Sequence, residues 1–257
     1  MKLKKSELRD FLLEKADLYA RKSFIEEDPV LIPHRFNQND DIEISGLLAA
    51  TLAWGQRKTI IAKSEDLIER MDDAPADFVK NASRKDLETF NGFVHRTFQA
   101  EDIKGLVNAL KVLYSEYHNI GDFFGQHLDS QEHLGAAFTA FKRYLLDNGL
   151  PNRAAKHFGD PTKGSACKRI TMYSRWMTRS AKEGIDFGIW DISPALLSLP
   201  LDVHSSRVAR SLGLLKRKQS DWKAVRELDH AIRKIEPNDP ARLDYALFGL
   251  GVYEGWK

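Results

Sequence analysis

Apolar residues recur along most of this chain at the three- and four-residue spacing of an α-helix. The clearest run covers residues 103–117, with apolar side chains at 103, 106, 107, 110, 113, 114 and 117. No stretch shows sustained alternation of apolar and polar residues, which would indicate a half-buried β-strand. The sequence therefore predicts an all-α fold of roughly ten helices. The other expected helices span 8–21, 41–54, 60–71, 134–145, 165–180, 195–199, 203–212, 222–235 and 240–248.

Several of these helices carry recognisable start and stop signals. Asp202 stands where an N-cap is expected for the helix over 203–212, and Gly213 stands where that helix should end. Asp40 and Glu43 have the spacing of a capping pair at the start of the helix over 41–54. The segment EEDPVLIPHRFNQ holds two prolines and is expected to be an extended connector.

Length and composition limit the architecture and the class of protein. A chain of 257 residues can bury a substantial core, and we expect one catalytic unit of two helical lobes. Residues 40–195 would form the central lobe, and residues 1–39 with 196–257 the second. Cys167 is the only cysteine, which excludes an intramolecular disulfide and four-cysteine zinc or iron–sulfur sites.

No run approaches the roughly 18 uninterrupted apolar residues of a membrane span. We therefore expect a soluble monomer with no membrane partner, located in the cytoplasm, and associated with the nucleoid if the protein is bacterial.

Basic residues cluster locally although the formal charge is only +2. Residues 163–182 and 203–218 contain several Lys and Arg and neither Asp nor Glu. Such clusters favour a phosphate backbone as partner, so the expected ligand is nucleic acid, with double-stranded DNA first. The expected phosphate-contacting residues are Lys163, Arg169, Arg175, Arg179, His204 and Arg207.

Lys168 and Asp202 are the two residues best suited to chemistry. Lys168 should lie near a helix start, where the amide dipole disfavours a cation and so favours the free amine that can attack carbon. A carboxylate at Asp202 could orient an amine or stabilise a positive transition state. Two simpler interpretations stay open: Lys168 as a solvated lysine on a basic face, and Asp202 as a helix cap alone.

The basic helix places Lys168, Met172, Arg175 and Arg179 on one face by their spacing. An ordinary charged face explains this arrangement about as well as a DNA contact does. No second His, Cys or acid stands at ligand spacing from His204, so no metal site is expected.

The segment 200–214, PLDVHSSRVARSLGL, resembles the (V/L)D(T/V)H…R…R…LG signature of the helix-hairpin-helix DNA glycosylase superfamily. The upstream lysine and the segment 239–251, DPARLDYALFGLG, make the chain most similar to the archaeal 8-oxoguanine glycosylase branch and its uncharacterised bacterial relatives. The similarity covers residues 160–252 and, more faintly, 40–70, where LLAATLAWGQRKTI resembles the helix-turn that presents a DNA-contacting glutamine.

The resemblance implies a glycosylase and lyase that flips an oxidised purine, 8-oxoguanine first, out of damaged double-stranded DNA without a cofactor. It implies that Lys168 is the nucleophile and Asp202 the catalytic acid. It further implies that the extruded base is read by Gln56 and Asp244, with its faces against Met172 and Phe248.

Two features depart from the family pattern. The hairpin reads HFGDPTKGSACK, with Ala166 in place of the second glycine, which leaves Lys163 as a rival nucleophile. The segment GIDFGIW, residues 184–190, lengthens the lysine-to-aspartate separation as an insertion. Two other functional hypotheses remain: a non-catalytic protein that binds structured DNA or RNA, and a helical interaction scaffold.

Overall fold

The computed structural model describes residues 4–129 and 132–256. It confirms the all-α prediction, because helices account for nearly all of the regular structure. The one described sheet is a hairpin of two short strands, β1 (Val94–His95) and β2 (Phe98–Gln99). The α-helices are α1 (Lys5–Tyr19), α2 (Asn39–Leu52), α3 (Arg57–Glu69), α4 (Pro75–Asn81), α5 (Ala100–Glu116), α6 (Ile120–Gln126), α7 (Gly135–Asp147), α8 (Lys168–Thr178), α9 (Val203–Ser211), α10 (Trp222–Ile232) and α11 (Leu243–Val252).

Short 3-10 helices occupy most of the longer connections. They are η1 (Lys22–Glu27), η2 (Pro29–Leu31), η3 (Pro33–Arg35), η4 (Asp86–Phe90), η5 (Asn152–His157), η6 (Pro161–Lys163), η7 (Ala181–Glu183), η8 (Pro194–Leu196) and η9 (Pro240–Arg242). The connector expected to be extended is instead coiled into η2 and η3, because each of its prolines begins a turn.

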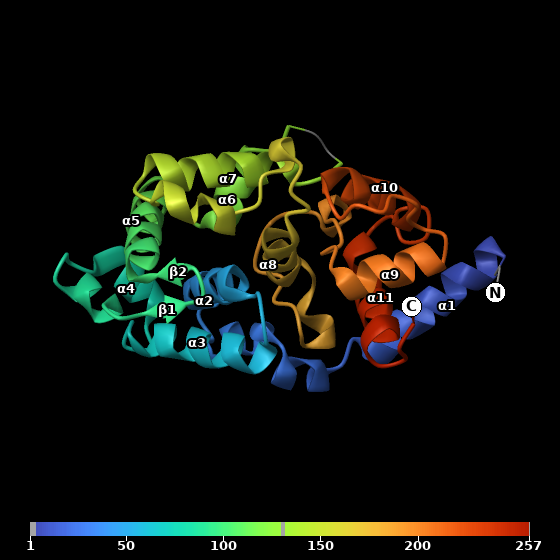
Figure 1. The fold of residues 1–257 in the computed structure, drawn as a ribbon, viewed down its shortest axis with the longest axis horizontal. Coiled ribbons are helices and arrows are strands. Elements are labelled where there is room, and N and C mark those ends of the chain that lie inside the picture. The colour runs from blue at the N-terminus through green and yellow to red at the C-terminus, as the bar shows by residue number, and fades with distance from the viewer. Residues whose placement is uncertain (1–3, 130–131, 257) are drawn as a thin grey trace.

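The helices form two lobes, each around its own hydrophobic core (Figure 1). Helices α2 to α8 surround the first core, while α1 packs against α11 beside α9 and α10 in the second. The N-terminal helix therefore joins the C-terminal helices. Val30 and Ile32 belong to the first core, so the chain crosses between the lobes earlier than the expected boundary at residue 39.

Two sequence signals at helix starts had different outcomes. Asp202 is the N-cap of α9, and its Oδ1 accepts from the backbone N–H of Ser205 at 2.7 Å, which confirms the capping prediction. Helix α8 begins at Lys168 and not near Ser165, because Cys167 has a left-handed backbone with φ 53°. Helices α4 and α6 have seven residues each, too few for a periodic pattern to reveal.

Glu43 does not cap α2, which corrects the expected capping pair. Its side chain is buried and accepts hydrogen bonds from Tyr114 Oη and Trp190 Nε1. It also accepts from the backbone N–H groups of Ile120 at 3.0 Å and Gly121 at 3.2 Å. Burial raises the pKa of Glu43, and these donors oppose that shift. The carboxyl group thus joins α2, α5 and α6 inside the first lobe.

Candidate active site

A cavity of about 600 Å³ opens between the two lobes. The segment from η1 to η2, the turn between α2 and α3, and the first half of α8 contribute its wall from the first lobe. The starts of α9 and α11 form the opposite wall. A volume of this size is within the range of small-molecule sites. The charged residues that line it are Asp28, Arg57, Lys156, Lys168, Arg169, Arg175, Asp202 and Asp244.

Lys168 and Asp202 meet at this cavity. Lys168 is the first residue of α8, Asp202 precedes α9, and the Lys168 Nζ to Asp202 Oδ2 distance is 3.9 Å. The lysine side chain is 42% exposed and the aspartate 15%. The amine is therefore open to a ligand, while the carboxylate is held in place by its cap bond to Ser205. The capping role and a chemical role at Asp202 use different oxygens.

The loop before Lys168 is fixed to the opposite lobe. The backbone N–H of Trp222 donates to Gly164 O at 3.2 Å, and Ser165 forms an isolated bridge with Asp221. Trp222 begins α10, so the second lobe helps to determine where the first turn of α8 lies. Contacts with the second lobe therefore hold the backbone before Lys168 in place, although this loop lacks the Gly-rich hairpin of the family pattern.

Gly159 and Cys167 pack tightly within this loop. A Cβ atom added at Gly159 would lie 2.8 Å from Cys167 Cα, so only glycine fits. Burial raises the pKa of the Cys167 thiol to about 12. A thiol with so high a pKa is almost entirely protonated at neutral pH and is a poor nucleophile. The described structure therefore gives Cys167 a packing role in this loop.

Asp244 lies on the cavity wall, but both of its carboxyl oxygens already have partners. Its Oδ2 accepts from Arg175 Nη1, and its Oδ1 accepts from Ser205 Oγ at 3.5 Å. Burial raises the pKa of Asp244 to about 6; Arg175 opposes this shift, and the charge on Asp202 adds to it.

The other expected base-contacting residues separate into two groups. Met172 and Phe248 line the cavity from opposite lobes, and the Arg57 guanidinium lies 5.1 Å from the centroid of the Phe248 ring. Gln56 occupies the N-cap position of α3 with an exposed side chain. It is not among the residues that line the cavity, whereas its neighbour Arg57 is.

The expected phosphate-contacting residues are spread more widely. His204 is exposed at the cavity edge, while Arg169 is held by a 2.7 Å hydrogen bond to Thr51 O and lies 4.8 Å from the centroid of a Trp54 ring. Lys163 in η6 and Arg207 on α9 are exposed outside the cavity.

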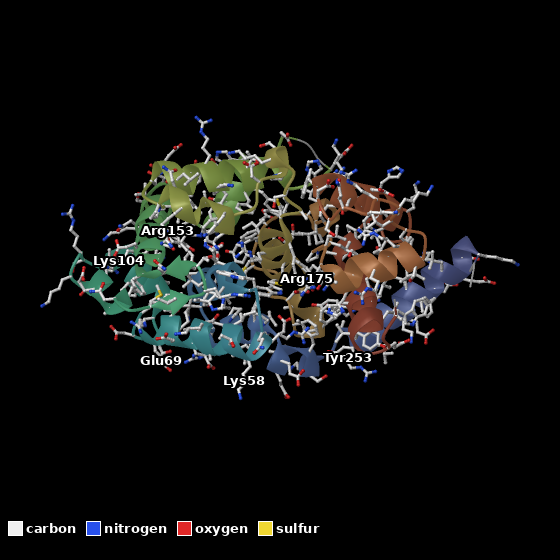
Figure 2. The ribbon with its side chains drawn as sticks, in the orientation of Figure 1. Lys58, Glu69, Lys104, Arg153, Arg175 and Tyr253 are labelled. Carbon is white, nitrogen blue, oxygen red and sulfur yellow. The ribbon has the colours of Figure 1, made fainter. Side chains whose placement is uncertain are left out.

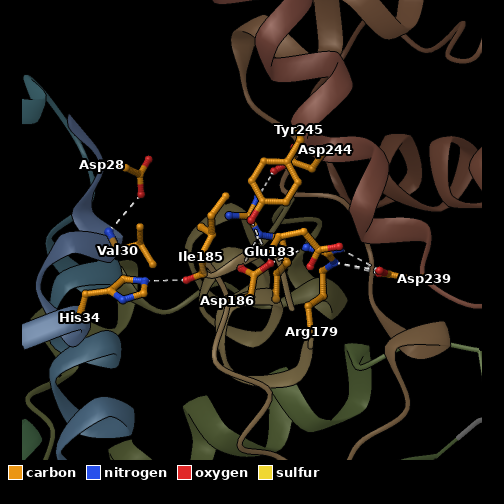
Figure 3. A network of polar contacts seen from close by, with 11 residues as sticks. Asp28, Val30, His34, Arg179, Glu183, Ile185, Asp186, Asp239, Asp244 and Tyr245 are labelled. Atoms are coloured by element: carbon orange, nitrogen blue, oxygen red, sulfur yellow. Dashed lines mark hydrogen bonds and ion pairs between the residues drawn. The ribbon is translucent and has the colours of Figure 1, made fainter. Parts of the chain in front are cut away.

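Arg175 and Arg179 are interior residues, which corrects their expected exposure to DNA. Their side chains are 3% and 2% exposed. Arg175 pairs with Asp186 and Asp244, while Arg179 pairs with Asp186 and Asp239. Figure 2 shows Arg175 in the middle of the molecule, and Figure 3 shows Arg179 between its two carboxylates. At this exposure the two guanidinium groups compensate interior carboxylates and do not form an exposed basic face.

Asp28 is a cavity residue that the sequence interpretation missed. It is 9% exposed, and its Oδ1 caps η2 by accepting from Val30 N–H at 3.0 Å (Figure 3). Burial raises the pKa of Asp28, against the opposing charges of Arg175, Arg57 and Lys168. An available signal was the Asp-Pro pair at residues 28–29, the same pattern that marked the start of the last helix at 239–240.

Five Lys or Arg and three Asp line the cavity, so its wall is suited to an anionic ligand. Within residues 4–129 and 132–256, no group of three or more His, Cys, Asp or Glu is arranged to hold a metal ion. In the same part of the chain, no helix is both long and apolar enough to cross a membrane.

Comparison with known proteins gives one match. Residues 28–253 match the model of the family described as "Protein of unknown function (DUF2400)". No curated protein and no solved structure matches the chain. The matched range begins at Asp28 and includes every residue that lines the cavity except Phe24. Since the match covers most of the sequence, this chain belongs to the DUF2400 family.

Proposed function

We propose that this protein is a DNA glycosylase with lyase activity that removes an oxidised purine, 8-oxoguanine first, from damaged double-stranded DNA. The observation that carries the proposal is the 3.9 Å approach of Lys168 Nζ to Asp202 Oδ2 at the mouth of a cavity of about 600 Å³. An amine and a carboxylate so placed suit nucleophilic substitution at a sugar carbon.

The proposed reaction begins when the nucleotide leaves the duplex and its base enters the cavity, at a cost of a few kcal/mol. Lys168 Nζ, reacting as the free amine, forms a bond to C1′ while the C1′–N9 bond breaks, and the proton that the new secondary ammonium group loses goes to the departing base. The base departs with the bonding electron pair. The Asp202 carboxylate stabilises the positive charge that develops on the sugar. Ring opening gives a Schiff base, and β-elimination then cleaves the strand.

The test is reduction of that Schiff base. Incubation with an 8-oxoguanine duplex and borohydride should leave a covalent protein–DNA adduct, and a panel of other lesions would establish specificity. If no lesion or pre-formed abasic site gives an adduct while DNA binds regardless of damage, the protein is a non-catalytic nucleic-acid-binding protein instead.

Asp202→Asn should keep the fold but lose turnover by about 100-fold or more, which is the usual range for a lost general acid–base group. Asparagine caps helices as well as aspartate does, so α9 should be retained. Single-turnover excision together with thermal unfolding separates the two effects. If Asp202→Asn unfolds at the assay temperature and loses activity only for that reason, Asp202 acts through the cap alone.

Binding to undamaged duplex should weaken steeply with salt, because each phosphate contact releases counterions. The logarithm of the binding constant should fall with the logarithm of the salt concentration, with a slope of about −0.9 per phosphate contact. Arg207 is exposed on α9, the helix that Asp202 caps, so Arg207→Ala should lower the slope by about one. Arg143 is the control, since it is 84% exposed on α7, away from the cavity between the lobes. An effect of Arg143→Ala as large as that of Arg207→Ala would contradict a localised contact.

A further inference from the structure

The five cations that line the cavity differ in what they already contact. Three of them have polar partners within the protein, namely Lys168, Arg169 and Arg175. The other two are Arg57, which is half-buried, and Lys156, which is exposed. Neither side chain forms an ion pair or a hydrogen bond with any residue in the ranges 4–129 and 132–256. Their N–H donors are therefore available to a ligand.

A third cation of this kind stands at the tip of the β1–β2 hairpin. Arg96 is exposed, and its side chain has no ion pair or hydrogen bond with the part of the chain that the structure describes. Its guanidinium lies against the backbone of Gly55, where an added Cβ atom would be 2.8 Å from Arg96 Nη1. Because Gly55 lines the cavity, Arg96 lies at the edge of that cavity.

The packing around Trp54 brings these three cations to one edge of the cavity. The sequence neighbours of Arg96 and Lys156 are His95 and His157, whose ring centroids lie 4.6 and 4.8 Å from that of Trp54. The third cation follows Trp54 by three positions, at the start of α3. Three segments that are distant in the sequence thus each place a cation beside one aromatic side chain, which itself lines the cavity.

The hairpin tip is fixed in place although its backbone is strained. Arg96 has φ 56°, a conformation in which glycine, asparagine or aspartate is the usual turn residue. The Phe98 ring centroid lies 5.1 Å from that of His157, and Thr97 O accepts from Arg153 Nη2 at 3.2 Å. An arginine held in such a conformation by its surroundings favours a role for its side chain beyond the fold.

The charge of this edge acts on the two buried histidines. Burial, and then the charges of Arg169 and Lys156, lower the pKa of His157 to about 4. Burial also lowers the pKa of His95, and the charge of Arg96 adds to that shift. Positive charge that acidic side chains do not compensate attracts a polyanion.

We propose that Arg57, Arg96 and Lys156 bind phosphate groups of the duplex beside the extruded nucleotide, so that the β1–β2 hairpin is part of the DNA-binding surface. This inference rests on the proposed glycosylase function, which supplies DNA as the ligand. None of the three residues belongs to the basic clusters 163–182 and 203–218, from which the phosphate contacts were expected. They place phosphate-binding groups on the first lobe, opposite the cavity wall that α9 and α11 form.

The test compares the salt dependence of duplex binding in two variants that lose the same charge. Each lost phosphate contact lowers the magnitude of the slope by about 0.9, so a triple variant should lower it by about three. That variant carries Arg57→Gln, Arg96→Gln and Lys156→Gln. The control variant changes three exposed cations of the first lobe that do not line the cavity, by Arg84→Gln, Lys85→Gln and Arg143→Gln.

The control variant should change the slope by less than about one, because its cations lie away from the cavity. A loss in the control as large as that in the first variant would overturn the inference, as would an unchanged slope in the first variant.

Arg96→Gly separates the side chain of Arg96 from its place in the turn. Glycine adopts a positive φ readily, so the melting temperature should not fall, while the magnitude of the slope should decrease by about one. A lower melting temperature with an unchanged slope would assign Arg96 to the hairpin alone and contradict the proposal. Failure of the glycosylase proposal is distinguishable, since wild type would then give no borohydride adduct with any duplex, whatever the slopes.

Discussion

Lys168→Gln should abolish borohydride trapping on both 8-oxoguanine and abasic duplexes while DNA binding is retained. Glutamine has no amine that can form a Schiff base, and the other cavity-lining cations remain to contact DNA. Lys168 side-chain exposure is 42%, so the substitution should cost little stability. The measurement is adduct formation on a denaturing gel, with binding followed separately by fluorescence anisotropy.

Lys163→Gln is the matched control for this experiment. Lys163 is exposed at the end of η6, five positions before Lys168, and does not line the cavity. Its variant should be trapped at the wild-type level. Trapping that disappears in Lys163→Gln and persists in Lys168→Gln would transfer the nucleophile to Lys163 and contradict the assignment made from the cavity.

The sequence predicted the parts of the fold that depend on local patterns. Apolar periodicity located the long helices, and the cap at Asp202 followed from a short polar side chain before a helical run. The convergence of Lys168 and Asp202 came from the resemblance and not from periodicity, which says nothing about how two distant helix starts approach one another. The closeness of these groups depends on the packing of two lobes around separate cores.

The incorrect predictions share one physical cause. A sequence pattern does not show whether a charged side chain is paired with another residue in the interior. Arg175 and Arg179 have helical spacing typical of a basic surface, yet buried carboxylates compensate both. Glu43 resembled a capping residue and instead joins three helices of the first lobe. Asp28 escaped notice because it reaches the cavity by packing beside residues that are distant in the sequence.

Asp186→Asn should destabilise the protein by about 3–5 kcal/mol, the usual effect of breaking a buried ion pair. Asp186 lies in the segment 184–190, which the sequence suggested was only an insertion. Its side chain is 1% exposed and pairs with both Arg175 and Arg179, while Tyr245 Oη donates to Oδ2 at 2.9 Å. An amide of the same shape leaves two interior guanidinium groups with less compensating charge.

Asp239→Asn is the control, because this carboxylate also pairs with Arg179 but is 27% exposed and therefore solvated. Its loss should cost less than that of Asp186, because water can replace part of its interaction with Arg179. Urea unfolding of the three proteins measures the difference. Losses of equal size for the two variants would mean that Asp186 is no more important than a surface partner. A large loss for Asp186 alone would show that the segment 184–190 supplies the anion that compensates the buried Arg175 and Arg179.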